Sequence, residues 1–390
     1  MIALKLAIRN LLGAGLRTFL IVIILSVSYF LIIFMNGMYQ GWDKQAKNDM
    51  IAWEVGEGQY WQEEFDPYDP ITLTDAHAKI PIEFTHEVVK GTAAAILFTQ
   101  GTIYPEGRMQ GIMLRGIGVN QKAIAIPSSQ LVSEEGEIPA LIGTRFAEGA
   151  KLEVGDEVLI RWRDVNGTFD ATEIKIAGIF STTVPAVDVG QVWIPLEKMQ
   201  QMTGMTGEAT MIVAGRQAEL PPEVSGWVFR DHSFLFADLE AMIQTKTIGG
   251  SMFYLIMLAL ALLAVFDTQV LSIFRRQREI GTYISMGMTR PEVVGLFTVE
   301  GAMHALLALL LATIYGIPLL LYIQKTGIAM PEGTDDFGMA AAERLMPYYS
   351  LALILGTVIV VMIATTVVSY LPARKISKMN PNDAIRGKIQ

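Results

Sequence analysis

The chain has 390 residues, 52% of them hydrophobic, a formal net charge of −9 and no cysteine. Without cysteine, disulfides, thiol nucleophiles and thiolate metal sites are excluded. The acidic balance argues against nucleic acid as a partner.

Four apolar runs dominate the hydropathy pattern. They cover Phe19–Met38, Met252–Phe274, Gly295–Ile323 and Ser350–Leu371. Each has roughly 20 or more largely apolar residues, which at 1.5 Å per residue crosses a hydrocarbon core of about 30 Å. We therefore expect an α-helical membrane protein whose four transmembrane helices span residues 19–38, 251–274, 295–323 and 350–371.

The first run could be a membrane anchor or a cleaved signal peptide. Its basic leader is long, and its apolar core exceeds the usual length of about 7–15 residues. The sequence Met35-Asn36-Gly37-Met38 offers no small-x-small cleavage site. These features favour an uncleaved anchor.

Basic residues indicate which side of the membrane each segment occupies. Outside the runs and the long insert they gather in three segments, as Lys5, Arg9, Arg17, Arg275, Arg276, Arg278, Arg290, Arg374, Lys375, Lys378, Arg386 and Lys388. Cytoplasmic segments carry an excess of lysine and arginine. We therefore expect segments 1–18, 275–294 and 372–390, with both termini, in the cytoplasm. The insert 39–250 and the loop 324–349 then lie outside.

The insert between the first two runs is acidic and is long enough to bury its own core. Val158–Arg163 and Thr172–Ile176 alternate in polarity around Asn166-Gly167, which predicts a β-hairpin with a type I′ turn. A short strand is expected at Val192–Ile194, and short helices at 139–149 and 196–204. The insert should therefore be a mixed α and β domain. Asn166-Gly167-Thr168 also matches a glycosylation sequon, but the turn explains it better.

Two further features of the insert have alternative interpretations. The aromatic and acidic run Trp53–Tyr68 could bind something hydrophobic, or it could bury its aromatic rings in the domain core, which we favour. Helical stalks are expected at Gln40–Met50 and Ser233–Thr247, where the chain leaves and re-enters the membrane. Such stalks would connect movement of the membrane helices to the insert.

The cytoplasmic loop 275–294 carries a helix signal. Thr289 with Glu292 three residues later forms a capping box, and Pro291 suits a first helical turn. A helix should begin there and lead into the third span. The arginines of this loop could serve only to fix topology, since any cytoplasmic loop contains them.

Several motifs resemble those of the FtsX-type permeases of ABC transporters. They are R-x-R-E-I-G at Arg276–Gly281, M-G-M-T-R at Met286–Arg290, the Glu300-Gly301 pair, the tail motifs Pro372–Arg374 and Asn380–Arg386, and the N-terminal amphipathic motif Leu6–Leu11 with Arg17-Thr18. The large insert is similar to that of the MacB and LolC/LolE branch. Gly56–Pro67 and Leu114–Ile117 resemble the lipoprotein-releasing LolC/LolE side.

In such permeases a helix of this cytoplasmic loop docks onto a separate ATPase. The resemblance therefore implies a coupling contact at Arg278, Glu279, Ile280, Gly281, Met286, Gly287, Thr289, Arg290 and Glu292. Ile280, Ile284 and Met286 would insert as apolar knobs, and the charges would set the register. No G-x-x-x-x-G-K-[ST] motif occurs, so we expect no cofactor on this chain and assign ATP with Mg to a partner ATPase dimer.

Ionisable residues also fall inside the spans. Glu300 and His304 lie one turn apart in the third span. They could form a proton relay, or Glu300 could form a structural pair with an arginine or with His304. We favour the structural pair. Asp267 lies in the second span, where the family more often has a neutral amide. His77, His86 and His232 lack metal-ligand spacing, no catalytic motif is present, and the substrate-binding residues are unknown.

The leading expectation is a non-enzymatic permease subunit that couples cytoplasmic ATP hydrolysis to lipoprotein release from the inner membrane by mechanical transmission. MacB-like efflux with a periplasmic adaptor and FtsX-like regulation of cell-wall hydrolases are the alternatives. Four spans are too few to enclose large cargo. We therefore expect a second copy or a homologous permease in the bilayer, and a periplasmic carrier or adaptor outside.

Overall fold

The computed structural model describes residues 15–132, 136–329 and 344–378. The motifs expected at Leu6–Leu11 and Asn380–Arg386 lie outside this part of the chain. The described residues form two compact units. The helical unit contains those up to Asp43 and from Ala241 onward, and the α/β unit contains Lys44–Glu240.

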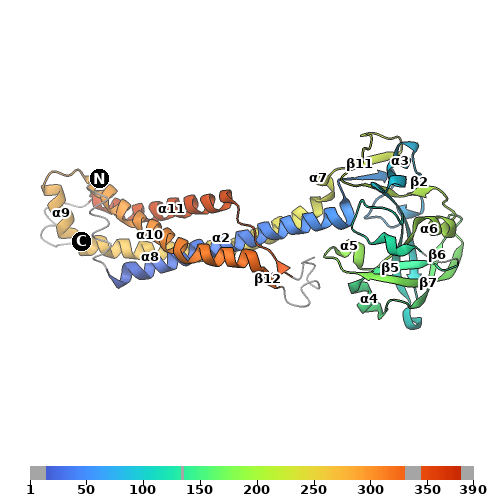
Figure 1. Ribbon diagram of the computed structural model, residues 1–390. Coiled ribbons are helices and arrows are strands. Elements are labelled where there is room, and N and C mark those ends of the chain that lie inside the picture. The colour runs from blue at the N-terminus through green and yellow to red at the C-terminus, as the bar shows by residue number, and fades with distance from the viewer. Residues whose placement is uncertain (1–14, 133–135, 330–343, 379–390) are drawn as a thin grey trace. The chain divides into compact units, whose positions relative to one another are not determined.

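Among the described residues, four helices are long and apolar enough to cross a membrane. They are α2 (Leu16–Met50), α8 (Ala237–Arg275), α10 (Arg290–Thr326) and α11 (Leu351–Ala373) (Figure 1). The expected fold class, four membrane helices with a mixed domain between the first and second, is confirmed. The stalks are continuous with the spans, because α2 extends to Met50 and α8 begins at Ala237. The expected start at Ser233 is wrong, since Ser233 lies in a separate turn, α7 (His232–Leu235).

The helical unit packs through small and apolar side chains shared by its long helices. Its core joins Leu25 and Tyr29 of α2, Ala261 of α8, Ala308 of α10 and Val361 of α11, all of which are fully buried. Strands β12 (Ile328–Ala329) and β13 (Arg344–Leu345) pair with each other, and the segment that follows β13 packs on α2. There a Cβ on Gly37 would lie 2.2 Å from the Tyr349 ring, and one on Gly41 would lie 2.2 Å from the Met346 carbonyl oxygen. Only glycine permits these approaches.

The α/β unit is built on one 9-stranded sheet in the order β11-β1-β10-β3-β4-β8-β5-β7-β6. Its strands are β1 (Gln59–Gln62), β3 (Ala93–Ile103), β4 (Gln110–Ile117), β5 (Pro139–Gly143), β6 (Glu157–Arg163), β7 (Phe169–Phe180), β8 (Gln191–Pro195), β10 (Met211–Ala214) and β11 (Trp227–Arg230). A small separate ladder pairs β2 (Ala78–Lys79) with β9 (Glu208–Ala209). Short helices α3 (Ile82–Lys90), α4 (Thr144–Ala150), α5 (Pro185–Asp188) and α6 (Leu196–Thr203) complete the unit.

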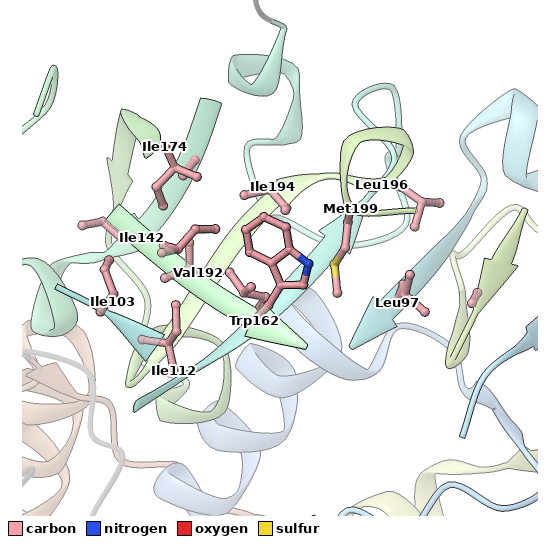
Figure 2. Close-up of a cluster of buried hydrophobic side chains, with 14 of the residues drawn as sticks. Leu97, Ile103, Ile112, Ile142, Trp162, Ile174, Val192, Ile194, Leu196 and Met199 are labelled. Carbon is pink, nitrogen blue, oxygen red and sulfur yellow. The ribbon is translucent and has the colours of Figure 1, made fainter. Parts of the chain in front are cut away.

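Strand β3 closes part of this sheet into a barrel. Its first half, Ala93–Ile96, pairs with β10, whereas Gly101–Ile103 pairs with β6 at the far end of the strand order. The ring β3-β4-β8-β5-β7-β6 encloses a core in which Trp162 lies among aliphatic side chains such as Ile112, Ile142 and Val192 (Figure 2). This pairing gives β6, the last strand in the order, a partner on its second edge, which protects that edge from pairing with another chain.

The hairpin expected around Asn166-Gly167 is present as β6 and β7, but its type I′ turn is wrong. Only Gly167 has a positive φ, of 80°, and the Asp164 carboxylate accepts from the backbone N–H groups of Asn166 and Thr168. This side chain stabilises a longer loop in place of the two-residue turn. The helix expected at 139–149 is also half wrong, because Pro139–Gly143 is the buried strand β5 and only α4 is helical. The helix at 196–204 is confirmed as α6.

The aromatic run Trp53–Tyr68 contributes to the core, as favoured. Trp53 stacks on Phe180 with ring centroids 5.6 Å apart, and Tyr60 and Trp61 are buried. The fold thus presents two places where polar side chains meet apolar surroundings: the cytoplasmic loop of the helical unit and a cavity of the α/β unit.

Candidate functional site

The cytoplasmic loop contains its own helix, α9 (Gln277–Ser285), between α8 and α10. The helix ends at Gly287, whose φ of +100° favours glycine, and the Gly287 and Met288 N–H groups donate to the carbonyls of Ile284 and Tyr283. The capping box of Thr289 and Glu292 is confirmed and begins α10. That box therefore starts the third span itself, and α9 precedes it.

Arg276 fastens α9 to α10. Its Nη1 donates to both oxygens of Glu300 at 2.8 Å, and its Nε and Nη2 donate to Glu279 at 2.6 and 2.8 Å. The guanidinium also lies 4.7 Å from the Phe297 ring centroid. Bidentate pairs of this kind fix orientation as well as distance. Glu300 therefore has its arginine partner in Arg276, which is the structural pair that we favoured over a proton relay.

The same network determines the charge state of the loop. Burial lowers the pKa of Arg276, but hydrogen bonds with Glu279 and Glu300 outweigh burial and raise it above its ordinary value. The hydrogen bond from Arg276 lowers the pKa of Glu279, assisted by the Tyr283 hydroxyl, which donates at 2.7 Å. Arg276 and Glu279 thus stay ionised over the physiological range.

The burial of α9 corrects one expected contact. Ile280 has no exposed surface and packs with Val293, Phe297 and Ile376 in the chain's own core. The expectation that Ile280 inserts into a partner as an apolar knob is therefore wrong, because its side chain is already buried in the core of this chain. Ile284 also packs partly against that core, and Gly281 is buried.

The outer face of the loop remains accessible. Met286 is 69% exposed, and the other exposed residues of the expected contact are Arg278, Gly287, Thr289, Arg290 and Glu292. Glu279 is half-buried beside Arg276. The face thus combines two arginines and one acid around a single large apolar side chain.

The three intramembrane ionisable residues occupy different environments. Glu300 and His304 are buried, and the His304 Nδ1 lies 3.2 Å from the Gly301 carbonyl. Asp267 is exposed on α8. Near Glu300, Gly301 lies against Ser369 and Gln269, so that a Cβ would come 2.2 Å from Ser369 Oγ. The structure therefore brings Glu300 and His304 together and leaves Asp267 on the surface of this chain.

The remaining histidines are engaged locally. His77 pairs with Glu208, His86 with Glu87, and the His232 Nε2 lies 2.9 Å from the Gly56 carbonyl. Within residues 15–132, 136–329 and 344–378, no group of three or more His, Asp or Glu side chains could hold a metal ion.

Residues 251–381 match the family model of the FtsX-like permease C-terminal domain. The C-terminal part of the chain is therefore an FtsX-like permease domain. The match covers α9, its Arg276 network and the three helices around them.

Known proteins similar to this chain include two lipoprotein-releasing system transmembrane proteins LolC, from Xylella fastidiosa strains Temecula1 and 9a5c. Each is 23% identical over 313 residues, covering 72% of this chain and 74% of the relative. Among solved structures, the extracellular domain of the noncanonic ABC-type transporter YknZ from Gram-positive bacteria is 13% identical. The superposition covers 41% of this chain and 83% of the YknZ domain, and its TM-score of 0.27 is too low to indicate a shared fold.

Arg276 is the residue that sequence reasoning missed. It stands in the R-x-R-E-I-G motif, three residues before Glu279, a spacing that places two side chains on one helix face. That spacing could have predicted the Glu279 pair. Its second partner, Glu300, comes from the tertiary packing of α9 against α10, which local spacing does not encode.

Proposed function

We propose that this permease is the membrane subunit of an ABC complex that releases lipoproteins from the outer leaflet of a bacterial inner membrane. A separate cytoplasmic ATPase dimer binds ATP with Mg and moves α9 together with the start of α10. The continuous helices α2 and α8 carry that movement to the exported α/β unit, and a carrier or adaptor accepts the cargo. The similarity to LolC favours release over the efflux and hydrolase-regulating alternatives.

The observation that carries the mechanical part is the attachment of α9 by Arg276. Force applied to a helix is transmitted only if the helix cannot rotate independently of its neighbour. Two bidentate pairs to Glu279 and Glu300, with Ile280 buried beneath them, supply that attachment. The exposed Met286 and Arg278 then offer a partner an apolar anchor with a charged rim.

The exposed position of Asp267 supports a second permease subunit. A carboxylate on the lipid-facing surface of a membrane helix is costly, by about 2.5–3.5 kcal/mol at the centre of the span on insertion scales. The exposed face of α8 around it is apolar and includes Leu260, Leu263 and Leu271. A neighbouring permease that supplies a polar partner to Asp267 would relieve this cost.

The test is purification of the full chain from its native membranes, with identification of bound proteins by mass spectrometry. We expect an ABC ATPase and lipid-modified proteins to co-purify. Met286→Glu should lose the ATPase because it charges the apolar anchor, whereas Val154→Glu, at an exposed position of the α/β unit, should retain it. Release of lipoprotein by the purified chain with no nucleotidase present would contradict the proposal.

A further inference from the structure

The α/β unit contains a cavity of about 210 Å³ between η1 (Ile51–Val55) and the sheet. Its walls are largely aromatic, with rings from Trp61, Phe65, Tyr68, Phe98, Trp193 and Phe234. A dry cavity of about 150 Å³ accepts benzene. This cavity therefore has room for one aromatic ring with a short polar substituent.

The walls are held in place by contacts among themselves. Trp61 lies edge-on to Phe65 and Phe234, with ring centroids 5.1 and 5.6 Å away. Its Nε1 donates to Gln59 at 2.7 Å, and the Trp193 Nε1 donates to the Val187 carbonyl at 3.0 Å. Since both indole N–H groups are satisfied by the chain, a ligand meets ring faces and edges.

Three charged residues line the cavity, and two of them are already engaged. The Arg115 guanidinium lies 4.8 and 5.0 Å from the Phe98 and Trp193 ring centroids and donates to Gln191 and to the Ala186 carbonyl. Burial lowers the pKa of Arg115 to about 10, against the opposing effect of Glu54. The Asp238 carboxylate accepts from the Tyr68 hydroxyl.

Glu54 is the third charged residue and differs from the other two. It lines the cavity and is half-buried, and among the described residues no side-chain hydrogen bond or close ion pair reaches its carboxylate. Burial raises the pKa of Glu54, and the charge of Arg115 only partly opposes this effect. A half-buried carboxylate that accepts no side-chain hydrogen bond carries a desolvation cost that an external cation would offset. Together Glu54, Asp238 and Arg115 give the lining a net negative charge.

We propose that this cavity binds a monovalent organic cation that consists of an ammonium group and an apolar body the size of one aromatic ring. The ammonium pairs with Glu54, and the body lies against Trp61, Phe98 and Trp193. Aromatic faces attract cations through their quadrupoles, so the walls that contact the apolar body also favour the charge. The site is independent of the lipoprotein cargo and of the ATPase contact.

The experiment measures binding of phenethylammonium to the full chain in phosphatidylcholine nanodiscs by isothermal titration calorimetry. The probes for comparison are 2-phenylethanol, which keeps the ring and lacks the charge, and 3-phenylpropionate, which reverses it. Empty nanodiscs correct for partitioning into lipid. We expect phenethylammonium to bind about tenfold more tightly than 2-phenylethanol, the contribution of one partly desolvated ion pair with cation–π contacts.

Three variants separate the site from general effects of charge and folding. Glu54→Gln should weaken phenethylammonium about tenfold and leave 2-phenylethanol unchanged. Glu57→Gln removes the same charge three residues away, outside the lining, and should change neither. Ile124→Phe should weaken both probes because it fills the cavity, and unchanged thermal unfolding would show that the variants fold. Equal binding of the amine and the alcohol, or tighter binding of 3-phenylpropionate, would overturn the proposal.

Discussion

Arg276 donates to two carboxylates that lie in different helices, and one of them, Glu300, has only 8% of its side chain exposed. Removing one partner of a buried pair leaves the other charge uncompensated. The energetics of the loop should therefore depend more on keeping the pair complete than on keeping it charged.

Arg276→Gln should destabilise the helical unit by roughly 3–5 kcal/mol, because the buried Glu300 carboxylate loses its ion pair with Arg276. The double variant Arg276→Gln with Glu300→Gln should cost clearly less than the sum of the two single variants. Denaturant unfolding in detergent measures both. Arg108→Gln is the control, because its pair with Glu106 is exposed and should contribute at most about 1 kcal/mol. Additive losses at Arg276 and Glu300 would contradict this account.

The pH dependence of α9 follows from Glu279. Since Arg276 lowers its folded-state pKa, Glu279 contributes stability that is present above the ordinary glutamate value of about 4.3 and is lost only as pH falls through the lower folded value. Hydrogen exchange of residues 277–285, corrected for its intrinsic pH dependence, should thus stay slow at pH 4.3 and rise below it. Glu279→Gln should abolish this acid dependence. If residues 277–285 already lost their protection from hydrogen exchange near neutral pH, the assignment of this pH dependence to Glu279 would be refuted.

Whole elements show where sequence reasoning succeeds. The membrane helices follow from long apolar runs, and the start of α10 follows from its capping box, because both signals are local. The closed barrel does not follow, since β3 pairs with β10 through Ala93–Ile96 and with β6 through Gly101–Ile103. Those partners lie far along the chain. The strand β5 was mistaken for helix because a buried apolar strand and a short helix share one composition.

The end of α9 depends on Gly287. A Cβ there would meet nothing within 4 Å, so the penalty for substitution comes from its φ of +100° alone. Gly287→Val should therefore weaken ATPase recruitment without a steric clash. Gly287→Asn should retain more of the recruitment than Gly287→Val, because asparagine tolerates a left-handed backbone better. Quantitative co-purification measures recruitment. Gly295→Val is the control on α10, and equal losses for asparagine and valine at Gly287 would count against a backbone cause.

The packing of α10 on α11 depends on Gly301. A Cβ on Gly301 would lie 2.2 Å from Ser369 Oγ and 2.4 Å from Ser369 Cβ. Gly301→Ala should therefore lower the free energy of unfolding by about 1–3 kcal/mol through overpacking. Adding Ser369→Gly to that variant should restore part of the lost stability. Gly356→Ala on α11, where a Cβ meets nothing within 4 Å, should be neutral or mildly stabilising. The measurement is thermal unfolding of the unsubstituted protein, Gly301→Ala, Gly301→Ala with Ser369→Gly, and Gly356→Ala. If Ser369→Gly restored no stability to Gly301→Ala, the proposed contact would be refuted.

At the scale of the whole molecule, the proposed mechanism requires the loop with α9 and the α/β unit to lie on opposite sides of a membrane. Basic residues around α9 and the acidic insert indicate this orientation through the excess of lysine and arginine in cytoplasmic segments. The cargo, by contrast, is not encoded in any local pattern, because recognition of a large ligand depends on surfaces assembled from distant segments.

Because the chain has no cysteine, single substitutions give site-specific labels without background. Met286→Cys and Val154→Cys replace side chains that are 69% and 61% exposed, in the helical and α/β units respectively. In spheroplasts a membrane-impermeant maleimide should label Val154→Cys and spare Met286→Cys, and in inverted vesicles the pattern should reverse. Detergent-solubilised protein should label at both positions, which controls for reactivity. Labelling of both positions from the same side in sealed membranes would place the coupling loop and the exported unit together, and force could then not pass across the membrane as proposed.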